Sequence, residues 1–272
     1  TKTVKMKSIY YILLLSLLTS FSNAQHNDPI PEHETFTIQS KEVGELRTIN
    51  VWTPSGYKSG PDSFPVLYMP DGGIKEDFPH MANTLADLIK AKKIKPIILV
   101  GIENTQRRKD LTGQTNIKKD KEIAPVVGGS EQFRAFVSNE LFTEINKRYR
   151  TTTRKGIIGE SLAGLFVTET FFLKPDLFDF YIAFDPSLWW NDKYLLKTAD
   201  KYLDAFPTAQ KEFWFAGSKT KGIFETTGKL ADILKAKNIK NLSWEYSPER
   251  TEKHNTIFRA AKEKALIWAM NS

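Results

Sequence analysis

A single serine lies among small residues in the stretch GESLAG, residues 159–164. The run RKGIIG before it is typical of a buried strand, and the apolar spacing over residues 162–173 predicts a helix. A tight turn from strand to helix would leave the Ser161 hydroxyl exposed, as in a nucleophile elbow. The strict G-x-S-x-G pattern reads here as G-x-S-x-A, with glycine one place later. A serine that only caps a helix after a glycine turn is the alternative interpretation.

A serine nucleophile needs a base to remove its proton, and the chain contains four histidines. Only His254, in SPERTEKHNTIF, follows Ser161 along the chain. On a strand–helix architecture of this kind the order is serine, then acid, then histidine. The sequence therefore predicts His254 as the base, against the alternative of a histidine in a surface loop.

The oxyanion of an acyl-transfer reaction needs backbone N–H donors. One predicted donor is the N–H of Leu162, directly after the nucleophile, where the helix dipole also favours negative charge. The second is expected from the loop PDGGIKEDF, whose glycines Gly72 and Gly73 would let the backbone approach a substrate. An ordinary turn is the alternative for this loop.

These residues must be positioned by an alternation of strands and helices. Two initial strands, followed by strand–helix alternation, predict a mixed sheet with an antiparallel start and helices on both faces. The expected strands are residues 35–40, 46–54, 64–73, 96–102, 154–159, 180–186, 212–217 and 242–248. The expected helices lie near residues 80–93, 131–148, 162–173, 192–205, 225–237 and 256–270. The long polar connection over residues 104–133 has the character of a lid or binding loop.

Composition excludes several classes of function. The 272-residue chain has no cysteine, which excludes disulfides and thiolate chemistry. Its net charge of +7 is dispersed, and three lysines among residues 1–24 account for part of it, so nucleic-acid binding is not expected. No metalloprotease motif, P-loop or dinucleotide fingerprint is present, so neither a metal nor a cofactor is expected.

The N-terminus resembles an export signal. Lys5 and Lys7 precede the apolar run SIYYILLLSLLTSF, and SNA offers small residues before a cut that would leave Gln25 first. The run is shorter than the ~20 residues of a spanning helix. The sequence predicts a signal peptide over 1–24, a flexible mature N-terminus over 25–34 and one catalytic domain over 35–272. It predicts a periplasmic or secreted protein with no membrane span after cleavage.

Several blocks together resemble the putative-esterase family of α/β-hydrolases, the group of enterochelin (siderophore) esterases and esterase D-like enzymes. The matching blocks are PVLYMPDGG, IILVGIENTQRRKDLT, GGSEQFRAFVSNELFTEINKRY, GIIGESLAGLFVTETFFLKPDLFDFYIAFDPSLWWND and HNTIF. The resemblance implies an α/β-hydrolase fold with a mostly parallel eight-stranded sheet. It also implies Ser161 as nucleophile, His254 as base, and Gly73 and Leu162 as oxyanion donors.

The same resemblance gives roles to side chains at the mouth of the site. Arg107, Arg108 and Asp110 of the QRRKDLT loop would shape the mouth together with Trp189 and Trp190. The arginines would contact an anionic substrate such as a catecholate siderophore, or form part of a solvated charge run. The two tryptophans would stack on an aromatic group or pack under the loop.

The acid of the triad departs from the family pattern. Family members often carry a carboxylate shortly after the penultimate strand, where this chain reads Ser218, Lys219, Thr220 and Lys221. Glu225 is the next acid and the expected partner of His254, although an acid that opens a helix also complements the helix dipole. Glu249 and Glu252 are further candidates, and a Ser161–His254 dyad is the remaining alternative.

The expected function is a serine carboxylic-ester hydrolase that forms an acyl-enzyme on Ser161 and takes a small-molecule ester, of siderophore or aryl type. An acyl transferase would form the same intermediate. A non-catalytic binding protein on the same fold is the competing class, favoured only by the departure at the acid. The sequence does not indicate an oligomeric state.

Overall fold

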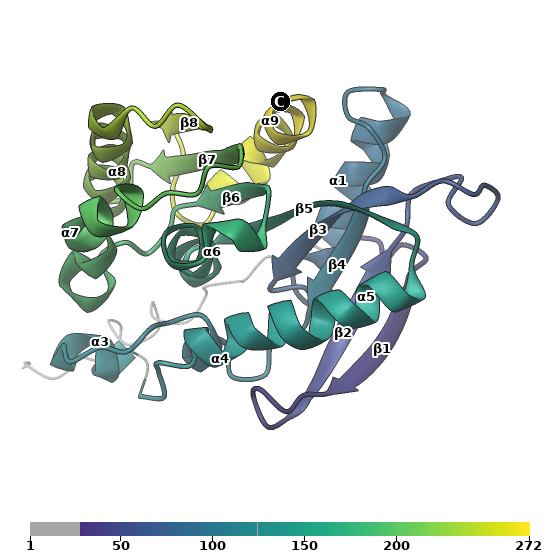
Figure 1. The fold of residues 1–272 in the computed structure, drawn as a ribbon, viewed down its shortest axis with the longest axis horizontal. Coiled ribbons are helices and arrows are strands. Elements are labelled where there is room, and N and C mark those ends of the chain that lie inside the picture. The colour runs from purple at the N-terminus through teal and green to yellow at the C-terminus, as the bar shows by residue number, and fades with distance from the viewer. Residues whose placement is uncertain (1–27, 124) are drawn as a thin grey trace, which may run out of the picture.

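The computed structural model describes residues 28–123 and 125–272, so the predicted signal peptide at 1–24 lies outside the described residues. An eight-stranded sheet forms the centre of the molecule, in the order β1-β2-β4-β3-β5-β6-β7-β8 (Figure 1). Strand β2 pairs antiparallel with both β1 and β4, and every pairing from β4 to β8 is parallel. The predicted antiparallel start and mostly parallel sheet are confirmed.

The strands lie within a few residues of the predicted ranges because each is a short apolar run bounded by turn residues. Their bounds are β1 (Glu34–Gln39), β2 (Leu46–Trp52), β3 (Phe64–Pro70), β4 (Ile98–Ile102), β5 (Thr151–Glu160), β6 (Phe180–Phe184), β7 (Lys211–Ser218) and β8 (Leu242–Glu249).

Each predicted helix is also present. The bounds of the longer helices are α1 (Phe78–Lys90), α6 (Leu162–Leu173), α7 (Trp190–Leu203), α8 (Ile223–Lys237) and α9 (Ile257–Asn271). The predicted helix over 131–148 consists of α4 (Ser130–Ala135), a π-helical stretch η1 (Phe136–Leu141) and α5 (Phe142–Arg148). The short elements are α2 (Arg107–Asp110), α3 (Lys118–Ile123) and the 3₁₀ turn η2 (Pro175–Leu177).

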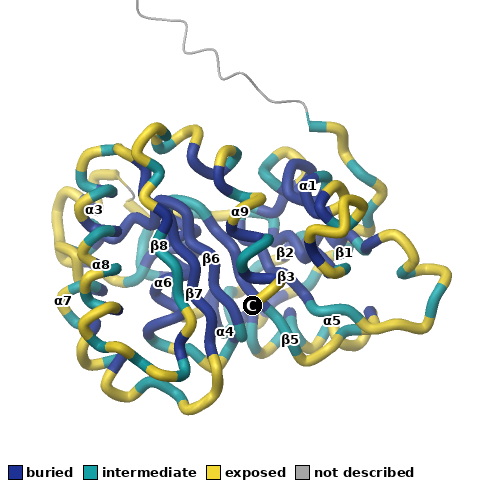
Figure 2. Tube along the Cα trace, turned by 90° about the horizontal axis from the view of Figure 1, so that it is seen from above, coloured by how far each residue is buried: buried dark blue, intermediate teal, exposed yellow. Residues whose placement is uncertain are grey.

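The helices cover the two faces of the sheet unequally. One core cluster joins the sheet to α4, η1, α5, α6, α7 and α8, and the other joins it to α1 and α9. The side chains of β7 alternate between these clusters: Phe213 and Phe215 face the first, and Trp214 and Ala216 face the second. Figure 2 shows the central strands as a continuous buried layer between exposed loops. This burial on both faces explains why the strands carry unbroken apolar runs.

The polar connection over residues 104–133 is anchored at several points, although its composition predicts a loop. Asp110 forms an ion pair with the fully buried Arg47, with a distance of 2.7 Å between the charged groups. Asp120, also buried, accepts a hydrogen bond of 2.9 Å from the N–H of Asn191, near the start of α7. The assignment of Asp110 to the mouth of the site is therefore corrected, because its carboxylate serves as a buried anchor for the connection.

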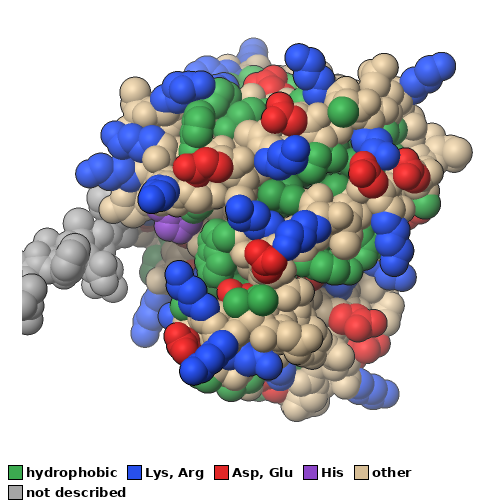
Figure 3. Space-filling model, turned by 90° about the vertical axis from the view of Figure 1, so that its left-hand side faces the viewer, with side chains coloured by type: hydrophobic (Ala, Val, Ile, Leu, Met, Phe, Trp, Pro, Cys, Tyr) green, Lys and Arg blue, Asp and Glu red, His purple; other side chains and the backbone are tan. Residues whose placement is uncertain are grey.

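Residues 28–33, expected to be flexible, make specific contacts. Asp28 forms an ion pair of 2.5 Å with Arg259 of α9, and the carbonyl of Pro29 accepts a hydrogen bond of 2.7 Å from Asn83. On the face that carries α3, α7 and α8, basic and acidic side chains are interspersed with apolar ones (Figure 3). Over residues 28–123 and 125–272, no helix has both the length and the apolar content needed to cross a bilayer.

Candidate active site

Ser161 occupies the turn between β5 and α6, as the sequence predicts. Its backbone has φ 59° and ψ −116°, a conformation that costs energy for any residue with a Cβ. The turn is fixed against the neighbouring strand: the N–H of Ser161 donates to the carbonyl of Phe184 over 3.0 Å, and the N–H of Ser187 donates to the carbonyl of Ser161 over 3.1 Å. The strain at this position is therefore held by the end of β6 and the loop after it.

The small residues around Ser161 are required by close backbone packing. A Cβ on Gly159 would lie 2.6 Å from the carbonyl carbon of Ala163, and one on Gly164 would lie 2.8 Å from the carbonyl oxygen of Phe184. Both distances are shorter than packed atoms tolerate. In the relaxed motif G-x-S-x-A-G, the turn therefore requires glycine at both of these positions.

His254 lies in the connection between β8 and α9 and faces Ser161. Its Nε2 atom is 3.1 Å from Ser161 Oγ, and its Nδ1 atom is 2.9 Å from Oδ2 of Asp185. Since an ionised carboxylate can only accept, the proton belongs on Nδ1, which leaves the Nε2 lone pair directed at the serine hydroxyl. The imidazole side chain is 40% exposed, whereas Asp185 is fully buried. The structure thus brings together a serine, a histidine and a carboxylate in the arrangement of a catalytic triad.

Asp185 follows β6, the strand beside the one that ends at Ser161. Its backbone φ is 42°, and its own N–H donates to the carbonyl of Ala216 over 3.0 Å. Its Oδ1 accepts the N–H of Ser218 over 2.6 Å, and its Oδ2 accepts the hydroxyl of Ser218 over 2.7 Å. The side chain is therefore held by the end of β7 while it faces His254.

The expectation that Glu225 reaches His254 is corrected by this geometry. Glu225 is the third residue of α8, and its carboxylate accepts the N–H of Gly222 at the N-cap, as in a capping box. Glu249 accepts the hydroxyl of Ser247 over 2.6 Å, and Glu252 accepts that of Thr256 over 2.7 Å. All three predicted candidates are engaged locally.

The two predicted oxyanion donors differ in whether the backbone N–H already has an acceptor within the protein. Leu162 is the first residue of α6, so its N–H has no acceptor within the helix. The N–H of Gly73 instead donates to Oε2 of Glu76 over 2.7 Å, and the side chain of Asn104 donates to Oε1 of the same carboxylate over 2.7 Å. The N–H of Gly73 is therefore occupied by an internal carboxylate in this structure, whereas the N–H of Leu162 has no acceptor within its own helix.

The two arginines predicted at the mouth are both engaged with the protein. Arg107 makes two hydrogen bonds with the carboxylate of Asp71, of 2.5 and 2.8 Å. Arg108 donates to the carbonyl of Ile123. The positive charge of Arg107 is thus compensated by Asp71, which follows β3.

The two tryptophans lie at the start of α7, in the segment that follows β6. Trp190 is buried and donates from its indole N–H to the carbonyl of Gly113 over 3.1 Å, while Trp189 is partly buried and packs on the core. Of the two alternatives given for the tryptophans, packing under the loop describes Trp190. A cavity of about 350 Å³ lies beside it, lined by Gly113, Gln114, Thr115, Asn116, Leu165, Glu169, Trp190, Asn191, Tyr194 and Leu195.

Two carboxylates that repel each other, those of Glu160 and Asp77, have raised pKa values. Burial raises the pKa of Glu160, directly before Ser161, to about 8, with the nearby charges of Asp77, Asp185 and Asp71 adding to the effect and Arg107 opposing it. Burial also raises the pKa of Asp77 to about 6. Perturbed pKa values of this kind are concentrated at functional sites.

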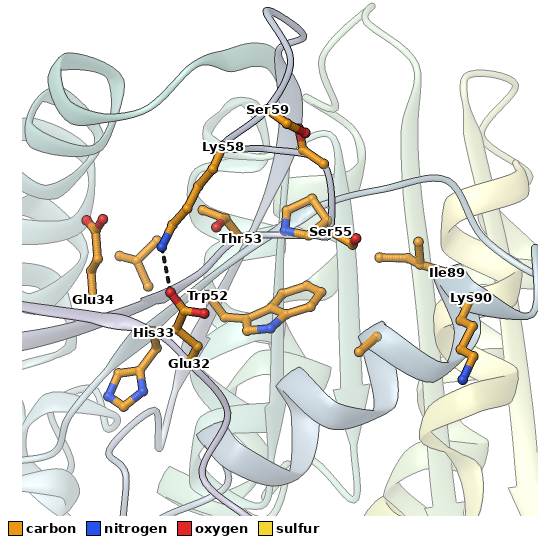
Figure 4. Close-up of a pocket in the computed structure, with 14 residues that line it drawn as sticks. Glu32, His33, Glu34, Trp52, Thr53, Ser55, Lys58, Ser59, Ile89 and Lys90 are labelled. Carbon is orange, nitrogen blue, oxygen red and sulfur yellow. Dashed lines mark hydrogen bonds and ion pairs between the residues drawn. The ribbon is translucent and has the colours of Figure 1, made fainter.

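A second cavity, of about 610 Å³, lies away from these residues. It is bounded by the N-terminal strand, the turn after β2 and helix α1, and Trp52, Lys58 and Lys90 are among its lining residues (Figure 4). Lys58 forms an ion pair with Glu32 across its rim. None of the predicted site residues lines it. In the part of the chain that the structure describes, no group of His, Asp and Glu side chains is arranged to hold a metal ion.

Comparison with known proteins agrees with the resemblance read from the sequence. The profile of the family described as Putative esterase matches residues 40–265. The chain belongs to this family. The matched range includes Ser161, Asp185 and His254, and it spans all strands from β2 to β8.

Two curated proteins are similar to this chain. The Ferri-bacillibactin esterase BesA of Bacillus subtilis is 29% identical over 195 residues, which cover 62% of this chain and 65% of that protein. The Siderophore triacetylfusarinine C esterase of Aspergillus fumigatus is 27% identical over 192 residues, which cover 65% of this chain and 63% of that protein. The chain therefore spans somewhat less than two thirds of the length of these relatives.

Solved structures share the fold. An IroE-like serine hydrolase from Shewanella oneidensis superposes with a TM-score of 0.81 at 24% identity, covering 88% of this chain and 80% of that one. The BES protein from Bacillus cereus superposes with a TM-score of 0.77 at 22% identity, covering 88% of this chain and 96% of that one. The α/β-hydrolase fold expected from the sequence is thus confirmed.

Proposed function

We propose that the protein is a serine carboxylic-ester hydrolase in which Ser161 is the nucleophile, His254 the general base and Asp185 the acid. The observation that carries the proposal is the continuous contact from Ser161 Oγ through the imidazole to Asp185, with distances of 3.1 and 2.9 Å. These distances lie within or close to hydrogen-bond reach for a nucleophile, its base and the group that orients the base. Membership of the esterase family supports the same reaction.

The geometry implies the following steps. Ser161 Oγ attacks the ester carbonyl carbon while its proton passes to His254 Nε2, and the resulting imidazolium is stabilised by Asp185. When the bond to the alcohol oxygen breaks, His254 gives this proton to the leaving oxygen, and an acyl-enzyme remains on Ser161. Water then attacks the acyl carbon with His254 again acting as base, which releases the acid and restores the serine.

The charge that develops on the carbonyl oxygen is stabilised from the start of α6. The N–H of Leu162 is the proposed donor, and the helix dipole adds favourable potential at the same place. We propose Gly73 as a second donor only after its N–H is released from Glu76, since the two are now joined over 2.7 Å.

We propose a siderophore ester as the substrate class, on the basis of the relatives' names. Both curated relatives described above are named as esterases of siderophores, one bacterial and one fungal. The arginines give no independent support, because Arg107 is paired with Asp71 and Arg108 with a backbone carbonyl. The proposed role in binding an aromatic group is therefore kept for Trp189 alone, which is only partly buried at the start of α7, since Trp190 is buried and bonded to Gly113.

A panel assay on the purified chain tests this function. The panel contains short p-nitrophenyl esters, a feruloyl ester and a tri-catecholate trilactone, the last in ferric and iron-free forms. Preferred hydrolysis of the trilactone is expected. Turnover of the feruloyl ester alone would contradict the substrate class but not the reaction, and turnover of none would favour a binding protein on this fold. The absence of a carboxylate after β7 does not favour a binding protein, because Asp185 is the proposed acid.

We further propose export to the periplasm or the outside, with cleavage before Gln25. The support is the basic, apolar and small-residue pattern of residues 1–24. Intact-mass analysis of the protein recovered from its producing cells is expected to show a chain that starts at Gln25, and retention of residues 1–24 would contradict export by this route.

A further inference from the structure

A closed ring of hydrogen bonds links the acid and the base of the site through two hydroxyl side chains. Asp185 Oδ2 accepts the hydroxyl of Ser218 over 2.7 Å, and the hydroxyl of Thr220 lies 2.9 Å from that of Ser218. Thr220 Oγ1 also accepts the backbone N–H of His254 over 3.1 Å. The imidazole Nδ1 of the same residue reaches Asp185 Oδ2 over 2.9 Å and closes the ring.

The direction of each bond in this ring follows from the donors available. A hydroxyl has one proton, and an ionised carboxylate has none, so Ser218 must donate to Asp185. The short contact between the two hydroxyls then requires Thr220 to donate to Ser218. Thr220 keeps its lone pairs for the backbone N–H of His254. Every proton in the ring has one acceptor, and such fully satisfied polar networks restrict the positions of their members.

The ring compensates for weak packing around the base. His254 is 40% exposed and lies in the short connection between β8 and α9, whose residues 250–256 are all exposed or only partly buried. Asp185 and Ser218, in contrast, are buried at the ends of adjacent strands. A second hydrogen bond joins the segment after β7 to the segment after β8. It runs from the N–H of Lys219, next to Thr220, to the carbonyl of Glu252 over 3.1 Å.

We propose that Ser218 and Thr220 are positioning residues that hold Asp185 and His254 as one unit, with the hydroxyl of Thr220 fixing the backbone of the histidine and that of Ser218 fixing the carboxylate. This inference rests on the proposed function, since it assigns these hydroxyls a role in orienting its base. It also accounts for Ser218 at the end of β7, where a carboxylate is expected from the family pattern. There the serine holds a carboxylate supplied by the neighbouring strand.

The variants Thr220→Val, Thr220→Ser and Ser218→Ala test the proposal. Thr220→Val keeps the size of the side chain and removes the hydroxyl, and is expected to lower kcat by about 10- to 100-fold with little change in KM, because a small misplacement of a catalytic group has effects of this size. Thr220→Ser restores the hydroxyl and is expected to restore kcat. Thr226→Val is the matched control, because the buried Thr226 hydroxyl donates only to backbone carbonyls in the first turn of α8.

Two further readouts separate positioning from general loss of structure. The double variant Ser218→Ala/Thr220→Val is expected to be no slower than the slower single variant, because residues that act as one unit are not additive. The low-field proton NMR signal of His254 Nδ1–H is expected in wild type, Ser161→Ala and Thr220→Ser, and to broaden or disappear in Thr220→Val and Ser218→Ala.

The NMR signal does not depend on turnover, so it separates failure of this proposal from failure of the proposed function. If wild type shows the signal but hydrolyses no ester, the function is wrong while the ring still holds the histidine. If Thr220→Val keeps the signal and has the kcat of Thr226→Val, the positioning role is wrong. Additive losses in the double variant would likewise overturn the ring as a single unit. Should Thr220→Val fail to fold, Ser218→Ala provides the same comparison of signal and kcat.

Discussion

Oδ2 of Asp185 lies 2.9 Å from Nδ1 of His254, although the two residues are 69 positions apart in the chain. The carboxylate follows β6 and the histidine follows β8, and the strand between them, β7, supplies the serine that holds the carboxylate. The proposed acid, Asp185, thus follows the strand adjacent to the one that ends before Ser161. His254 therefore has a carboxylate partner although no carboxylate follows β7.

Asp185→Asn is expected to reduce kcat by ~10³–10⁴-fold, because the amide no longer stabilises the imidazolium and favours the wrong tautomer of the base. The replacement has nearly the same shape, so the fold should persist. Steady-state kinetics with a p-nitrophenyl ester, together with the thermal midpoint, checks both expectations. A folded Asp185→Asn protein with wild-type kcat would show that this carboxylate does not act in catalysis.

Glu225→Gln is expected to leave turnover unchanged, in contrast to the role predicted from the sequence. Its carboxylate belongs to the cap of α8, where the loss of its charge and of the capping contact costs about 0.3–1 kcal/mol of stability. Kinetics and urea unfolding of the same preparation measure the two effects separately. A collapse of kcat in this variant would instead support Glu225 as the acid.

Glu160→Gln is expected to make stability less dependent on pH. The pKa of Glu160 in the folded state is raised to about 8 from the ordinary value of 4.5, because the partly buried group is desolvated and lies near other carboxylates. Between these two values the folded protein holds a proton that the unfolded chain has lost, so this group makes the folded state less stable as pH rises through that range. The neutral glutamine removes this loss.

The measurement for Glu160→Gln is urea unfolding near pH 5 and near pH 9. The free energy of unfolding of the variant minus that of wild type should be larger at the higher pH. This difference can change by at most about 1.4 kcal/mol per pH unit. The exposed residue Glu131 gives a control, Glu131→Gln, that should show no such difference. An equal effect of Glu160→Gln at both pH values would contradict the raised pKa.

The elements of the fold could be predicted because each leaves a local signal. Buried strands such as β6 and β7 read as short apolar runs, and the elbow at Ser161 is marked by glycine and alanine at the positions where a larger side chain would clash. His254 could be predicted by elimination, since no other histidine follows the nucleophile in the sequence. These inferences need only periodicity, local sterics and chain order.

The acid, and the contact that occupies the N–H of Gly73, could not be predicted in the same way. Which strand end faces His254 depends on the sheet order and on side-chain direction, and a single sequence gives neither. The available signal for Asp185 was an acid placed directly after a buried strand, in FYIAFDP. The alternative given for Glu225, an acid that complements the dipole at the start of a helix, needs only local information, and Glu225 does lie in the first turn of α8. The contact of Gly73 with Glu76 is a tertiary detail with no sequence pattern of its own.

The proposed reaction depends on a covalent intermediate at Ser161, and labelling with a fluorophosphonate detects a nucleophile of this kind. The reagent reacts with activated serines, so wild type should gain the mass of one adduct, and peptide mapping should place it on Ser161. Ser161→Ala, in which only a small hydroxyl is lost, should remain folded, take up no reagent and hydrolyse no ester. An adduct on another residue, or a Ser161→Ala protein that keeps wild-type turnover, would contradict the account.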